Sequence, residues 1–159
     1  MAADLAGLLE EHEVARTLYR FAAAIDTRDW AAYRAVFTDS LEVDYTSYRP
    51  GSVATMPADA WVARATALFP GLDATQHCLY NPLVDLDGDR ARCRVYLQAE
   101  HVLPNPLGDP TFTIGGYYDD RLVRAGDSWL ICAKKLVVTW SRGNRHVLTL
   151  GAERAAARY

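Results

Sequence analysis

Ala91-Arg-Cys-Arg-Val-Tyr-Leu-Gln-Ala-Glu-His-Val-Leu103 is the stretch of sequence that decides the fold. Apolar and polar residues alternate along it almost without exception, and this period of two predicts a long β-strand with one buried face. His101 is a polar residue in the apolar register. A buried imidazole needs a hydrogen-bond partner or a cavity to line. His101 is therefore either a structural core histidine or a site residue, and the strand alone leaves both interpretations open.

The length and composition of the chain predict one domain, residues 1–159, with a substantial hydrophobic core. Half of the 159 residues are apolar and 23% are charged, as in an ordinary globular protein. A net charge of −3 gives no basic footprint for nucleic acid or an anionic membrane. Neither a secretory leader nor a bilayer-spanning run is expected. We therefore expect a cytoplasmic protein whose three cysteines are buried free thiols.

Helical periodicity dominates the first half of the chain. It predicts helices over residues 9–26, 30–37 and 57–71. Alternating apolar and polar residues predict one short strand over residues 41–45. Thr27 or Asp29 is expected to cap the second helix and Thr55 the third. Tyr45 is expected to end the inward face of the short strand.

Strand-like patterns dominate the second half. They predict strands over 74–86, 91–103, 111–124 and 129–140, joined by hairpins. The paired glycines Gly115 and Gly116 predict a bend or bulge inside the third of these strands. Residues 147–150 indicate either a further short strand or a contact with a partner.

This order of elements favours an α+β fold. We expect a cone-shaped, curved antiparallel sheet packed against three N-terminal helices. A cone of this kind encloses a pocket, which is the usual form of a small-molecule site.

Asp26, Tyr45, His77 and His101 are polar residues that interrupt apolar registers. Asp26 alone is equally well interpreted as a turn residue at a helix end. Four acid–base side chains on elements around one cone, however, indicate a catalytic site. A carboxylate fixes the tautomer of an imidazole, and a tyrosine polarises a carbonyl oxygen. The histidines lack the spacing typical of a metal site, so no metal is expected.

The sequence resembles the SnoaL-like branch of the nuclear transport factor 2-like superfamily, and within it scytalone dehydratase. The resemblance covers roughly residues 9–141, and its motifs are residues 21–30, 42–48, 56–59, 74–77, 114–121 and 127–129. Some of these motifs are also similar to γ-hexachlorocyclohexane dehydrochlorinase. The resemblance implies a nuclear transport factor 2-like (cystatin-like) α+β barrel that works without a cofactor, as a homodimer or homotrimer.

The resemblance also implies roles for the four residues. His77 matches the general base that removes a carbon-bound proton, and Asp26 matches the carboxylate that orients it. Tyr45 matches a tyrosine that holds water or the substrate carbonyl. His101 matches the second active-site histidine of scytalone dehydratase.

Two departures from the family pattern bear on substrate contacts. A second tyrosine of the family falls at Ile25, and the family's serine and asparagine fall near Tyr117 and Asp119. Tyr48 or Tyr80 is left to supply the missing hydroxyl. The residues expected to contact the substrate are Tyr48, Tyr117, Asp119 and, as cavity wall, Trp140.

These observations predict a cofactor-independent lyase of the dehydratase type, acting on a small hydroxylated or cyclic carbonyl compound. An isomerase or cyclase of a polyketide-like intermediate would use the same dyad. A non-catalytic small-molecule-binding module is the third interpretation, because this fold also serves in binding.

Overall fold

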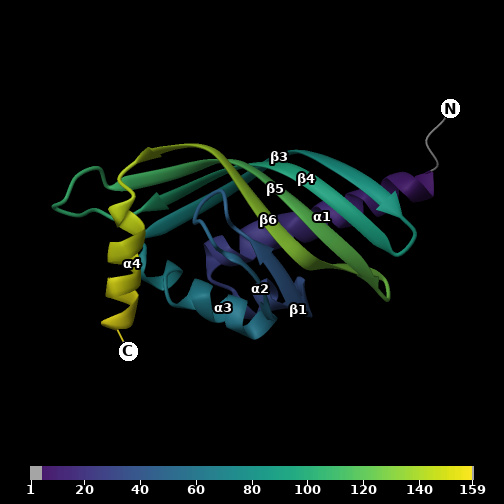
Figure 1. The fold of residues 1–159 in the computed structure, drawn as a ribbon, viewed down its shortest axis with the longest axis horizontal. Coiled ribbons are helices and arrows are strands. Elements are labelled where there is room, and N and C mark those ends of the chain that lie inside the picture. The colour runs from purple at the N-terminus through teal and green to yellow at the C-terminus, as the bar shows by residue number, and fades with distance from the viewer. Residues whose placement is uncertain (1–4, 159) are drawn as a thin grey trace.

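The computed structural model describes residues 5–158, which form one curled sheet and its covering helices (Figure 1). The elements in chain order are α1 (Leu5–Thr27), α2 (Trp30–Ala35), β1 (Phe37–Asp44), β2 (Val53–Pro57), α3 (Ala58–Thr66), the short 3₁₀ helix η1 (Phe69–Gly71), β3 (Ala74–Asp87), β4 (Arg90–Val102), β5 (Thr111–Ala125), β6 (Ser128–Gly143) and α4 (His146–Ala156).

The sheet has the strand order β2-β1-β6-β5-β4-β3. The long strands β3 to β6 arch over α1, α2 and α3, while α4 stands at one end of the arch (Figure 1). The α+β fold expected from the sequence is confirmed. One detail differs, because β1 pairs with β6 in parallel and the sheet is therefore mixed.

Two local expectations are corrected, and a third, the cap of the second helix, is confirmed for Asp29 rather than Thr27. The predicted second helix ends at Ala35, and Phe37 already belongs to β1. Asp29 caps α2 by accepting a hydrogen bond from the Ala32 N–H at 2.9 Å. Thr55 caps nothing, since it lies in β2, an edge strand too short to stand out in the sequence. Pro57 precedes α3 without a side-chain cap.

The C-terminal segment is a helix rather than a strand. The apolar alternation at 147–150 suggested β structure, but the residues of α4 that become buried are four apart: Val147, Gly151 and Ala155. Helical spacing therefore prevails over four residues of alternation. A Cβ at Gly71 would lie 1.7 Å from the Gly151 carbonyl oxygen, so the backbones of η1 and α4 pack directly on each other.

The β4 strand behaves as its sequence predicts. Its apolar residues Ala91, Cys93, Val95, Leu97 and Ala99 are buried, each at most 6% exposed. They pack on α1 and form part of one continuous core. All three cysteines are free, although only Cys93 is fully buried.

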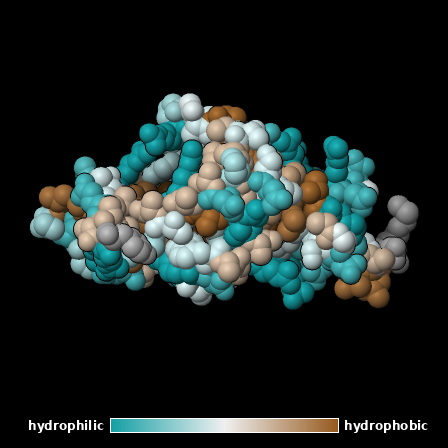
Figure 2. Space-filling view, turned by 90° about the horizontal axis from the view of Figure 1, so that it is seen from below, coloured by the Kyte–Doolittle hydropathy of each residue, from teal (hydrophilic) through white to brown (hydrophobic). Residues whose placement is uncertain are grey.

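Hydrophilic residues cover much of the face of the molecule that Figure 2 shows. Figure 2 shows the molecule from below, with hydrophobic patches that are small and separated by polar side chains. The first turns of α1 expose Leu5, Leu8 and Leu9. Within residues 5–158, no helix combines the length and apolar character needed to span a bilayer.

The predicted irregularity at Gly115-Gly116 is confirmed as a shift in the pairing of β5 with β6. A Cβ at Gly116 would lie 2.0 Å from the Val137 carbonyl oxygen, whereas one at Gly115 would meet the Trp140 ring at the same distance. The glycines thus allow the close backbone approach by which the sheet bends over the helices.

Gly116→Ala is expected to lower the free energy of unfolding by about 1–3 kcal/mol, because its methyl group meets fixed backbone. Gly115→Ala should cost less, since the Trp140 ring is half exposed and can move. Gly7→Ala is the matched control, because nothing lies near its Cβ. Urea unfolding measures all three, and equal stability of the Gly116 and Gly7 variants would contradict this account.

Candidate active site

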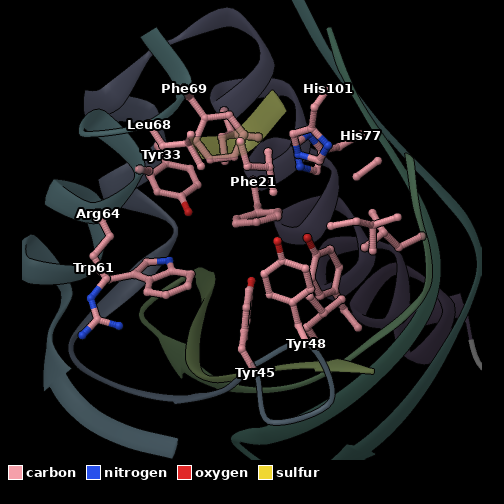
Figure 3. Close-up of a pocket in the computed structure, with 18 residues that line it drawn as sticks. Phe21, Tyr33, Tyr45, Tyr48, Trp61, Arg64, Leu68, Phe69, His77 and His101 are labelled. Atoms are coloured by element: carbon pink, nitrogen blue, oxygen red, sulfur yellow. The ribbon is translucent and has the colours of Figure 1, made fainter. Parts of the chain in front are cut away.

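A cavity of about 200 Å³ lies between the curled sheet and the helices α1, α3 and η1. Most of its wall is apolar or aromatic. Figure 3 shows His77 and His101 on one side of it, with Tyr33, Tyr45, Tyr48 and Trp61 directed into it from other sides. The volume is small for a ligand site, so a ligand that fits inside it must be compact.

Asp26 and His77 meet at the edge of this cavity. The Asp26 Oδ1 lies 2.7 Å from His77 Nδ1, and Asp26 Oδ2 accepts the His77 backbone N–H at 2.6 Å. The Thr75 hydroxyl donates to Asp26 Oδ1 at 2.9 Å. The His77 side chain is only 5% exposed and that of Asp26 is 20% exposed, so the pair is largely buried.

The contact depends on how α1 ends. Asp26 occupies the last turn of α1, and Arg28 turns the chain away with a left-handed φ of 61°. The Arg28 guanidinium then donates to the Ile25 carbonyl oxygen at 2.6 Å and to the Thr75 hydroxyl at 2.7 Å. Arg28 therefore ties the end of α1 to the start of β3 and holds Asp26 opposite His77.

These hydrogen bonds keep Asp26 ionised and so determine which nitrogen of His77 faces it as a donor. Burial tends to raise the pKa of Asp26, but the hydrogen bonds from His77 and Thr75 outweigh it and lower the pKa below its ordinary value. Asp26 is thus an ionised acceptor, and His77 Nδ1–H donates to it. The proton on Nδ1 leaves the Nε2 of neutral His77 with a free lone pair.

His101 lies beside His77, with their ring centroids 5.8 Å apart. Its Nδ1–H donates to the Phe112 carbonyl oxygen at 3.0 Å. Burial and the neighbouring His77 lower the pKa of His101 to about 4. His101 is therefore neutral near pH 7, and its Nε2 can only accept a hydrogen bond.

The phenol groups lie apart from the histidines. Tyr45 follows β1 directly instead of ending that strand, and it lines the cavity together with Tyr48, Tyr33 and Tyr118. Burial raises the pKa of both Tyr45 and Tyr118, and the proximity of the two phenols also affects both pKa values. Burial raises the pKa of Tyr33 as well, so Tyr33, Tyr45 and Tyr118 keep their protons near pH 7 and can donate hydrogen bonds.

Tyr117, Asp119 and Trp140 are absent from the cavity wall. Asp119 instead accepts hydrogen bonds from Arg92 and Arg94 at 2.6–2.9 Å. Tyr117 packs on Arg94, while Trp140 is 46% exposed. These three side chains do not join the proposed site, whereas Tyr48 does.

Tyr118 was missed by the sequence analysis, although a signal was present. The even-numbered residues Phe112, Ile114, Tyr118 and Leu122 alternate along β5 and are all buried. The register of this strand therefore indicates Tyr118 rather than Tyr117 as the inward tyrosine.

A buried ion pair was missed as well. Lys134 Nζ lies 2.8 Å from Asp120 Oδ2, and both side chains are inaccessible to solvent. The ammonium group sits 3.8 Å from the ring centroid of Phe21 and 3.5 Å from that of Tyr118. This ion pair packs against the rings of Phe21 and Tyr118, which form part of the cavity wall.

Residues 5–158 contain no group of three or more His, Cys, Asp or Glu side chains able to hold a metal ion.

Comparisons with known proteins agree with this architecture. The family model described as "SnoaL-like domain" matches residues 6–135. The crystal structure of the Kfla4162 protein from Kribbella flavida superimposes with a TM-score of 0.81 at 27% identity, covering 94% of this chain and 99% of that one.

Two more distant structures carry names that denote an activity. One, from Novosphingobium aromaticivorans, is provisionally named scytalone dehydratase; it has a TM-score of 0.74 at 22% identity and covers 86% of this chain and 88% of its own. The other is a hexachlorocyclohexane dehydrochlorinase (LinA, type 2), with a TM-score of 0.73 at 12% identity, covering 89% and 93%. These similarities confirm the nuclear transport factor 2-like fold expected from the sequence.

His101 should make the protein less stable in acid. The pKa of His101 is about 4 in the folded protein, against an ordinary value of 6.5. Between these two pH values the unfolded chain binds a proton at His101 and the folded protein does not. Stability should fall by about 2 kcal/mol from this residue between roughly pH 7 and pH 5.

His101→Asn keeps a donor for the Phe112 carbonyl and removes the titrating group. Urea unfolding at the two pH values should show a smaller loss for this variant than for the unmodified protein. An identical loss in both proteins would contradict the assignment of a buried neutral His101.

Proposed function

The chain belongs to the family of SnoaL-like domains, and on this premise we propose that it is a cofactor-independent lyase of the dehydratase type. Its substrate would be a small hydroxylated or cyclic carbonyl compound. The observation that carries the proposal is the Asp26–His77 hydrogen bond, which leaves the His77 Nε2 lone pair free beside an apolar cavity.

In this proposal, His77 Nε2 removes a proton from the carbon next to the substrate carbonyl. The electron pair of the broken C–H bond forms a carbon–carbon double bond, and the carbonyl oxygen becomes an enolate oxygen. Asp26 stabilises the imidazolium that results, as an ionised carboxylate does for a catalytic histidine. Tyr45 is the proposed hydrogen-bond donor to the enolate oxygen.

Dehydration completes the cycle. The enolate oxygen reforms the carbonyl, and the electrons of the enolate carbon–carbon double bond form a new double bond between the α- and β-carbons. The bond from the β-carbon to its hydroxyl breaks as this happens, and the departing hydroxyl takes the proton from His77 and leaves as water. The enzyme then returns to its initial protonation state. His101, which can only accept a hydrogen bond, would orient the leaving hydroxyl through Nε2 rather than protonate it. Tyr48 is a proposed substrate contact.

The names of two structural neighbours agree in kind with this reaction. A dehydratase and a dehydrochlorinase are both named for an elimination, in which a small molecule is lost from the substrate. The distance in sequence limits this likeness to the fold, so the proposal depends on the geometry of His77 and Asp26.

The proton-abstraction step is testable with β-tetralone in deuterium oxide, by mass spectrometry of deuterium uptake next to the carbonyl. The unmodified protein should accelerate uptake, and His77→Gln should lose at least about a hundredfold of that acceleration. Asp26→Asn should also be impaired, because an amide does not fix the required tautomer.

Tyr96→Phe is the matched control, because Tyr96 is exposed on the outside of the sheet. Circular dichroism verifies that each variant is folded. A folded His77→Gln protein with undiminished exchange would refute the proposal. With a β-hydroxy ketone as substrate, loss of the mass of water identifies a lyase, whereas an unchanged mass identifies an isomerase or cyclase.

A further inference from the structure

The indole of Trp61 is an unexplained polar group in the cavity wall. Its Nε1 is buried and makes no hydrogen bond within residues 5–158. The nearby Tyr33 phenol has a pKa that burial raises and that the indole partly lowers again, yet no hydrogen bond of proper geometry joins the two groups. A buried donor without a partner costs folding free energy, and such groups are rare in native proteins.

Packing contacts and a helix–helix ion pair position this indole. Trp61 lies in α3 between Ala58 and Ala65, both of which are buried. Its ring meets the Tyr45 ring edge-on, with centroids 5.2 Å apart. An ion pair at 2.6 Å between Asp59 and Arg34 ties α3 to α2. These contacts place the N–H in the cavity wall in the absence of a ligand.

The chemistry of the two sides of the cavity differs. Figure 3 shows Trp61 on the side opposite His77 and His101. The two imidazoles present acceptor lone pairs, because each Nδ1–H is already bound by Asp26 or by the Phe112 carbonyl. An indole N–H can only donate, so a ligand must bring an acceptor atom to satisfy it.

We propose that the Trp61 Nε1–H binds the carbonyl oxygen of the substrate and, after proton removal, the enolate oxygen. The proposal rests on the proposed function, because His77 is the base that creates that enolate. It defines the substrate as a compact, uncharged cyclic ketone that enters with its oxygen toward α3 and its acidic carbon toward β3. Trp61 is then a catalytic residue that complements Tyr45.

The test compares binding of β-tetralone with binding of tetralin, the same ring system without the oxygen. By calorimetry, Trp61→Phe should weaken binding of the ketone by about three- to tenfold and leave binding of the hydrocarbon unchanged. Trp140→Phe, which removes an indole away from the cavity wall, is the matched control and should change neither. Equal ketone affinity in the Trp61→Phe and unmodified proteins would overturn the proposal.

A second measurement needs no Trp61 variant. The indole N–H signal of Trp61 in an NMR spectrum, assigned by separate substitution of Trp30, Trp129 and Trp140, should move downfield with β-tetralone but not with tetralin. An unmoved signal with bound ketone would overturn the proposal. Neither measurement involves turnover, so a failure here is distinct from a failure of His77-dependent deuterium exchange.

Discussion

The hydrogen bond from His77 Nδ1–H to Asp26 is the interaction on which the rest of the site depends. It joins the last turn of α1 to β3, and it exists because the curled sheet brings that strand against the helix. Arg28 and Thr75 support the same junction. The bond determines which imidazole nitrogen faces the cavity without a proton, and therefore whether His77 can act as a base.

Two buried polar groups beside the cavity have partners that fix their hydrogen-bonding state. His101 donates its only N–H to the Phe112 carbonyl oxygen, and Lys134 forms an ion pair with Asp120 beside the ring of Tyr118. Buried groups of this kind are costly unless they are paired. The imidazoles remain as hydrogen-bond acceptors and the phenols as donors, so different sides of the cavity offer different hydrogen-bonding groups to a ligand. A carbonyl compound bound between these sides would have its acidic carbon and its oxygen at different groups.

The sequence predicts the fold class and the two partners of the central hydrogen bond, because both leave local signals. The alternation in β3 and the helical period of α1 identify their inward faces, and His77 and Asp26 are conspicuous as polar residues in those patterns. That these two residues form a pair was implied by the family resemblance. Pairing between distant segments leaves no such signal, so the parallel β1–β6 contact was not foreseen. The assignment of Tyr117 in place of Tyr118 came from family spacing rather than from strand parity. Lys134 stayed hidden because it reaches its buried partner only through the pairing of β5 and β6.

The tautomer of His77 tests the central claim most directly. Nitrogen NMR of protein labelled at histidine, recorded near neutral pH, distinguishes the two ring nitrogens of each imidazole. The account predicts a proton on His77 Nδ1, coupled to a low-field signal, and an unprotonated Nε2. A His77 with its proton on Nε2 would contradict the account, because the nitrogen facing the cavity could then no longer remove a proton from carbon.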